Sequence, residues 1–172
     1  RFDGEAKTAI QTYLQSPPSE QAHMLEDRHR RPGKGRVRLT RIRALCDGSE
    51  TTELSAGSDI ELVFDYEITS AEAVTSVRMR VGWTDLMGQP VFACLNNYSG
   101  HPIGRLPSPR GSIVVKIPDL PLSEGVYRLS VWIKSQEEME DVLSEAAEFS
   151  VRGGDFFGTG LLLPKDCGHV FV

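Results

Sequence analysis

Apolar and polar residues alternate with a period of two in several segments between Arg36 and Arg152. In "DIELVFDYEI", the apolar side chains of one face are Ile60, Leu62, Phe64, Tyr66 and Ile68, while Glu61, Asp65 and Glu67 take the other face. This period is that of a β-strand with one buried and one solvated face. The alternation therefore predicts strands through most of the chain.

Further strands are predicted in "RVRLTRIRALCD", "SVRMRVGWTD", "VFACL", "GSIVVKIPDL", "GVYRLSVWIK", "AAEFSVR" and "GHVFV". The first contains a phase slip at Thr40-Arg41, which predicts a β-bulge. The acidic stretch "SQEEMEDVLSEA" is expected to be a loop or one helical turn. Strands separated by turns, with no long internal helix, predict an all-β fold class: an antiparallel β-sandwich of residues 36–172.

The N-terminal segment has a different pattern. "FDGEAKTAIQTYLQS" predicts a short helix over residues 1–16, because Asp3 can cap it and the apolar stripe has helical spacing: Ala6, Ile10, Tyr13 and Leu14. Residues 17–35 are rich in proline, glycine and charge, which is typical of a linker. The chain does not start with methionine, so we expect a piece of a longer protein.

Composition narrows the function classes. The net charge of −5 argues against bulk nucleic-acid binding. The sequence contains no apolar run of about 18 residues, so it predicts no membrane span. The three cysteines, Cys46, Cys94 and Cys167, lack paired spacing and indicate reduced thiols in a cytosolic protein. The four histidines, His23, His29, His101 and His169, lack zinc-site spacing, and we expect no metal or cofactor.

The glycine-rich stretch "FSVRGGDFFGTG" raises the question of a phosphate-binding loop. Thr159 stands where the P-loop pattern requires lysine, and Pro164 stops any following helix. We interpret the stretch as a strand end followed by a turn. Gly153 and Gly154 are expected to supply backbone angles that other residues avoid, and Phe156 and Phe157 to anchor the turn.

Catalytic patterns are weak. There is no G-x-S-x-G elbow, and Ser99 and His101 in "NNYSGHP" are loop neighbours that rarely meet in reactive geometry. Asp65 and Glu67 share a strand face, so their Cβ atoms should lie about 6.6–6.8 Å apart. This spacing is compatible with the two carboxyl groups of a glycoside hydrolase. Any D-x-E in a strand has this spacing, so a glycosidase is the remote alternative.

Trp132 is a large aromatic residue that the strand pattern places on the outward face of its sheet. It alternates with buried positions, so its side chain should lie on the wetter face beside Arg128 and Ser130. An aromatic ring can cover the apolar C–H face of a sugar while arginines and carboxylates bind its hydroxyls. Arg78, Arg80 and Asp65 complete a predicted carbohydrate site if their strands share one sheet. The alternative is that the N-terminal helix or a partner subunit covers Trp132.

Several phrases together resemble the C-terminal domain of Wzt-type ATPases, the nucleotide-binding subunits of O-antigen polysaccharide ABC exporters. These are "GKGRVRLTRIRALCDGSETTELSAGSDIELVFDYE", "VGWTDLMGQPVF", "IPDLPLSEGVYRLSVWI" and "AAEFSVRGGDFFGTG". The N-terminal "GEAKTAIQTYL" resembles the last helix of the ATPase domain.

The resemblance implies an immunoglobulin-like or jelly-roll sandwich that binds the lipid-linked O-antigen (lipopolysaccharide) glycan in the cytoplasm before export. It implies no catalysis by this piece, since the ATPase would lie upstream. Its implied partners are that ATPase domain, the transporter's membrane subunit at the inner membrane, and a second copy in a homodimer, in some members through exchange of the C-terminal strand. The alternative is a dimerisation or regulatory module without a sugar site.

Overall fold

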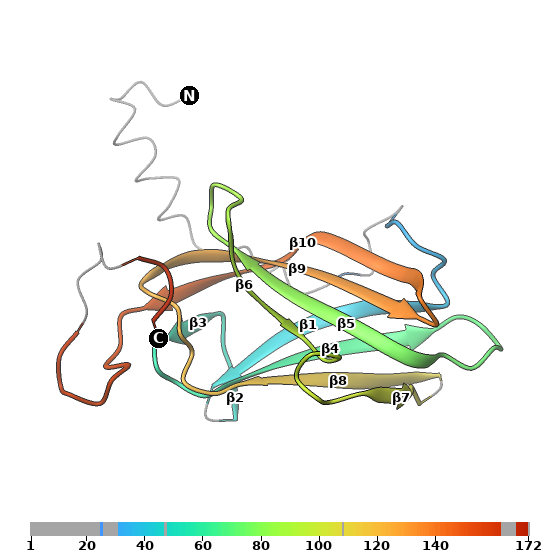
Figure 1. The fold of residues 1–172 in the computed structure, drawn as a ribbon, viewed down its shortest axis with the longest axis horizontal. Helices are drawn as coiled ribbons and strands as arrows, with labels where there is room; N and C mark the ends of the chain where they lie inside the picture. The colour runs from blue at the N-terminus through green and yellow to red at the C-terminus, as the bar shows by residue number, and fades with distance from the viewer. Residues whose placement is uncertain (1–24, 26–30, 47, 108, 163–167, 172) are drawn as a thin grey trace, which may run out of the picture.

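The computed structural model describes residues 25, 31–46, 48–107, 109–162 and 168–171. They form an all-β domain of two sheets that lie face to face (Figure 1). The four-stranded sheet has the order β2-β1-β4-β8, with strands Ser49–Glu50, Val37–Cys46, Ile60–Ile68 and Arg110–Ile117. The predicted N-terminal helix lies outside the described residues.

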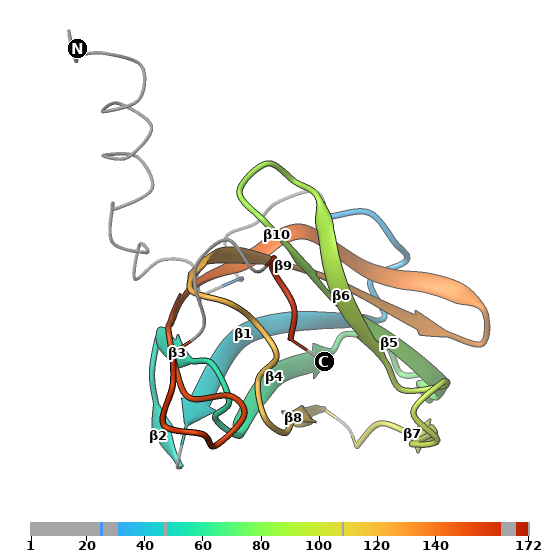
Figure 2. The ribbon, with the colours of Figure 1, turned by 60° about the vertical axis from the view of Figure 1, so that its left-hand side comes forward.

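The six-stranded sheet has the order β3-β10-β9-β5-β6. Its strands are Glu53–Ser55, Glu138–Arg152, Gly125–Ser135, Thr75–Thr84 and Pro90–Leu95, and β7 (Ile103–Arg105) also pairs with β5. The neighbours are antiparallel except β3 and β10, which pair in parallel. Figure 2 shows this sheet curling over the four-stranded one.

The alternation found in the sequence places the core between the sheets. The apolar members of β4, β5 and β9 are buried as predicted, including Phe64, Trp83 and Tyr127. Trp83 is fully buried and stacks on Phe92, with ring centroids 5.7 Å apart. The predicted bulge in β1 is confirmed, because its register with β4 shifts between Leu39 and Arg41.

The acidic segment after β9 is a correction to the sequence analysis. It is neither a loop nor a helical turn, because Ser135 pairs directly with Glu138 and the chain continues as β10. Gln136 and Glu137 form the two-residue turn with φ of 51° and 67°, the left-handed angles of a type I′ hairpin. Such angles are usually supplied by glycine or asparagine, which explains why the sequence pattern did not reveal the hairpin.

Two acidic side chains of β10 are fully buried because cations from the start of the domain reach them. Asp141 accepts from Arg38 (2.7 Å) and from the Leu39 amide (2.9 Å), and it lies 3.3 Å from Arg31. Glu140 binds the side chain and amide of Arg36. Because β2 pairs only with the last two residues of β1, the N-terminal part of β1 is an open edge of the four-stranded sheet, and these contacts join that edge to β10 of the other sheet.

The chain segment that enters the domain lies along this joined edge. The amides of Lys34 and Gly35 donate to the carbonyls of Met139 and Glu140, and the buried Leu25 donates its amide to Thr40. Gly33 has φ of +112°, and a Cβ there would overlap the Glu140 carbonyl, so this position requires glycine. The described part of the predicted linker therefore packs on the two sheets.

The glycine-rich stretch follows the end of β10 and contains a turn, as predicted, but the roles of its glycines differ from the prediction. Gly158 and Gly160 have positive φ, but Gly153 and Gly154 do not, so their predicted unusual angles are wrong. Gly154 is needed for space instead, because a Cβ there would overlap the Ala56 carbonyl.

The aromatic residues of this stretch differ in role. Phe156 packs against the core and lies 5.3 Å from the ring of Phe171, which confirms it as an anchor. Phe157 is 53% exposed, and its ring stands nearly perpendicular to that of Phe156, with ring centroids 5.0 Å apart. The predicted last strand is reduced to one bridge between Leu122 and Val170.

Candidate functional site

Five of the six predicted carbohydrate-site residues lie on one surface, the outer face of the six-stranded sheet. They come from two neighbouring strands: Arg78 and Arg80 from β5, and Arg128, Ser130 and Trp132 from β9. In the register of these strands, Arg80 lies beside Trp132 and Gly82 beside Ser130. We call this surface the Trp132 face.

Trp132 is half-buried on this face, between fully buried neighbours Val131 and Ile133. The Lys134 ammonium lies over its ring, 5.5 Å from the ring centroid, in cation–π geometry. Val142 of β10 lies beside it on the other side from Arg80. Whether the N-terminal helix also covers Trp132 lies outside the described residues.

Arg80 is held flat on the sheet next to Trp132. Its guanidinium donates to the Ser130 hydroxyl at 3.2 Å. A Cβ on Gly82 would overlap the same guanidinium, so the glycine leaves the space that Arg80 occupies. The Ser130 hydroxyl and the space beside Gly82 thus fix the position of this guanidinium.

The other two arginines of the Trp132 face form ion pairs at its ends. Arg78 pairs with Glu137 of the hairpin turn at 2.6 Å. Arg128 pairs with Glu148 at 3.1 Å and with Glu145 at 3.4 Å. Their charges are therefore already compensated by carboxylates of the same sheet.

Asp65 does not join this surface, and here the sequence-based grouping was wrong. Asp65 belongs to β4 of the four-stranded sheet and points to the outer face of that sheet. There it accepts from Arg43 at 2.9 Å and from the Ser112 hydroxyl at 2.5 Å. Alternation along one strand gives the face of a residue relative to its own sheet, but not which sheet the strand joins.

Glu67, the second carboxylate of the D-x-E pattern, lies on the same outer face as Asp65. Glu67 accepts from Arg110 at 3.1 Å, so both carboxylates of the D-x-E pattern are engaged in ion pairs with neighbouring strands. This is the arrangement of cross-strand charge pairs on a solvated sheet face.

Ser99, the hydroxyl residue of the Ser99–His101 pattern, donates its hydroxyl to the Asn96 carbonyl. This hydrogen bond lies within the loop itself.

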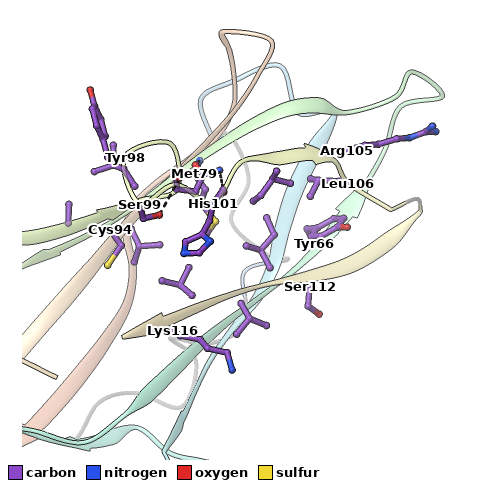
Figure 3. Close-up of a pocket in the computed structure, with 18 of the residues that line it drawn as sticks. Tyr66, Met79, Cys94, Tyr98, Ser99, His101, Arg105, Leu106, Ser112 and Lys116 are labelled. Carbon is purple, nitrogen blue, oxygen red and sulfur yellow. Dashed lines mark hydrogen bonds between the residues drawn. The ribbon is translucent and has the colours of Figure 1, made fainter. Parts of the chain in front are cut away.

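A cavity of about 820 Å³ opens at the seam where β8 faces β6 and β7. Its wall is formed mainly by apolar side chains, including Met79, Ile103 and Ile113. Figure 3 shows His101 pointing into the cavity, whereas Tyr98 and Arg105 point away from it. Tyr66 also lines the cavity, and burial raises the pKa of its phenol, whose OH donates to the Pro107 carbonyl at 3.1 Å.

Sequence reasoning identified the loop after β6 but not the role of Asn96 in it. The Asn96 side chain accepts from the Met79 amide at 2.9 Å and donates to the Val77 carbonyl at 3.0 Å. It therefore replaces a strand in the gap that β6 and β7 leave along β5. The same loop presents Tyr98 at 83% exposure, and the dipeptide Asn96-Asn97 before it was the available turn signal.

The described residues show neither a metal cluster nor a membrane-spanning helix. No group of three or more His, Cys, Asp or Glu side chains among them is arranged to hold a metal ion. None of the described residues forms a helix with the length and apolar character needed to cross a bilayer.

A family model described as the Wzt C-terminal domain matches residues 28–162. A crystal structure of the C-terminal domain of wzt superposes with a TM-score of 0.63 at 13% identity, covering 84% of this chain and 85% of that chain. No curated protein matches the chain.

Two larger enzymes contain regions with a weaker likeness. A β-glucuronidase of Parabacteroides merdae gives a TM-score of 0.40 at 17% identity, covering 67% of this chain and 13% of the enzyme. The alkylpurine DNA glycosylase AlkC of Pseudomonas fluorescens gives 0.42 at 13% identity, covering 69% and 31%. These scores are too low to bear on function.

The family model spans most of the two sheets, from the entering segment to the glycine-rich stretch after β10, and the fold agrees with that of a solved Wzt domain. The chain therefore belongs to the Wzt C-terminal domain family, the C-terminal domain of the O-antigen ABC transporter ATPase.

Proposed function

We propose that this domain is a non-catalytic module that binds the O-antigen polysaccharide before export. Membership of the Wzt C-terminal domain family supports the transporter context. In this proposal the ATPase activity resides in an upstream domain, with residues 1–16 as its last helix, residues 17–35 as the linker and residues 36–172 as the glycan-binding unit. The module would act in the cytoplasm, beside the membrane subunit, as a homodimer with an immunoglobulin-like or jelly-roll sandwich.

The single observation that carries the glycan proposal is the half-buried Trp132 on the outer face of a sheet, next to Arg80 and Ser130. A tryptophan fixed by buried neighbours loses little conformational entropy when a ligand stacks on it. Donors within the same row of the sheet can bind the hydroxyls of that sugar. Such an arrangement suits a long polymer, because several sugar units can lie along the strands.

Isothermal titration calorimetry of the domain with the source organism's own polysaccharide tests this function. We expect saturable heat that a non-cognate polysaccharide does not give. Trp132→Ala should weaken binding by about 1–3 kcal/mol if stacking resembles that of bases on aromatic side chains. Phe157→Ala is the control, because it removes an exposed ring from the C-terminal segment and should leave the affinity unchanged. Absence of cognate binding by the folded wild type would refute the proposal.

A second candidate function, a dimerisation or regulatory module, is supported by a different surface. Among the described residues, β8 pairs only with β4, so its other edge offers free backbone donors and acceptors. Tyr98 lies exposed near the same seam. Light scattering together with the glycan titration separates the two candidates. A dimer that gives no glycan response would favour the second.

A further inference from the structure

The charges of the Trp132 face are unevenly compensated. Within the described part of the chain, every carboxylate on this face that forms an ion pair does so at one of its ends, with Arg78 or Arg128. Arg80 and Lys134, which flank Trp132, form no ion pair with any described carboxylate. Two uncompensated cations therefore adjoin the exposed part of the tryptophan.

These two cations are arranged differently from ordinary surface charges. Among the described residues, the Arg80 guanidinium has one polar partner, the neutral Ser130 hydroxyl, and Gly82 provides the space in which the guanidinium lies. Lys134 is held over the Trp132 ring and lies beside Arg78 in the strand register. Three cations thus share the region with one carboxylate, Glu137. Placing like charges on neighbouring strands is unfavourable unless an anion joins them.

We propose that the glycan bound on the Trp132 face is anionic, carrying a carboxylate or a phosphate that Arg80 and Lys134 bind. This inference rests on the glycan-binding function proposed above and specifies the class of polysaccharide. The planar guanidinium of Arg80 matches the paired oxygens of a carboxylate or a phosphate. Lys134 adds a point charge from the Trp132 side, and the sugar ring that carries the anion contacts the part of the indole that Lys134 leaves uncovered.

A glycan array of bacterial polysaccharides tests the charge class directly. It should contain neutral polymers, polymers with uronic acids and polymers with phosphate in the repeat. We expect the wild-type domain to bind one or both charged sets and not the neutral set. Binding of one charged set alone would identify the anion as carboxylate or phosphate. Binding of the hit should also weaken as sodium chloride is raised, because the pair is partly solvated.

Arg80→Gln tests the residue assignment, and Arg110→Gln is its matched control. Both variants remove one positive charge, but Arg110 lies on the outer face of the other sheet and pairs with Glu67. We expect Arg80→Gln to lose about tenfold or more in affinity for the charged hit, since hydrogen bonds to charged groups are strong. Arg110→Gln should change it less than twofold. Near-ultraviolet circular dichroism checks the folding of both variants.

The outcomes distinguish the inference from the function on which it rests. Binding to neutral glycans that Trp132→Ala abolishes and Arg80→Gln leaves intact would overturn the anionic class and keep the glycan function. Equal losses in Arg80→Gln and Arg110→Gln would overturn the specific role of Arg80, leaving general charge attraction. Binding to no polysaccharide at all would overturn both proposals.

Discussion

Replacing Asp141 with asparagine should be among the most destabilising single changes in this domain. The carboxylate is fully buried, accepts hydrogen bonds from Arg38 and the Leu39 amide, and lies 3.3 Å from Arg31. Asparagine keeps the shape but removes the charge, so Arg38 and Arg31 each lose their ion pair with this side chain. The NH2 group of asparagine would also face a hydrogen-bond donor. Removal of one partner from a buried pair costs about 3–5 kcal/mol.

The exposure of the partners places the expected cost in that range. The Arg31 side chain is 11% exposed and that of Arg38 is 27% exposed, so water can solvate part of the charge that remains. We therefore expect the lower end, about 3 kcal/mol of unfolding free energy. With a urea m-value of about 2 kcal/mol/M, the unfolding midpoint would fall by about 1.5 M.

Urea unfolding followed by tryptophan fluorescence measures this effect, because Trp83 is fully buried in the core. Glu67→Gln is the control, since it also neutralises a paired carboxylate. Its partner Arg110 is 75% exposed, so the loss should stay below about 1 kcal/mol. A midpoint for Asp141→Asn within about 0.5 M of the wild type, at unchanged slope, would refute this account of the buried charges.

Three further predictions concern the same joined edge and the loop after β6. Gly33→Ala should lower the thermal stability more than Gly48→Ala does, because both glycines have positive φ but only at Gly33 would the added Cβ overlap another backbone segment. Equal losses in the two variants would contradict this. Asn96→Ala should speed hydrogen exchange of the Met79 amide and cost about 1–3 kcal/mol, because a partly buried donor loses its partner; unchanged exchange would argue against the strand-replacing role. The hydrogen bond from Lys34 and the charge of Arg36 lower the pKa of Glu138 in the folded protein, so its stabilising contribution is complete above its ordinary pKa of 4.5 and is lost as the pH falls through the lowered value. Glu138→Gln should therefore flatten the acid limb of stability against pH, and an identical limb would count against the pair.

Only part of the Trp132 face could be predicted from the sequence. The alternation around Trp132 placed Arg128 and Ser130 with it, and the structure adds Arg78 and Arg80 because β5 pairs with β9. The role of Gly82 could not be predicted, since the glycine matters only through the Arg80 guanidinium that occupies its side-chain space. The proximity of Lys134 to the Trp132 ring is a side-chain contact, which strand alternation does not specify.

The sequence alone determined the properties that repeat along each strand. The period of two identified the main strands, their buried faces and the bulge between Leu39 and Arg41, because the pleat makes each of these a local consequence of residue order. The quoted phrases also identified the family. These inferences needed no knowledge of which strands are neighbours.

Only the tertiary structure decided the properties that depend on pairing between distant segments. It placed Asp65 in the other sheet, away from Trp132. It turned the acidic segment into a strand, since the arginines that compensate Glu140 and Asp141 lie more than a hundred positions earlier in the chain. It also opened the cavity between β8 and β6, which neither strand encodes separately. The physical reason is that alternation fixes the side of its own strand on which a residue lies, whereas its neighbours depend on the order in which all strands pair.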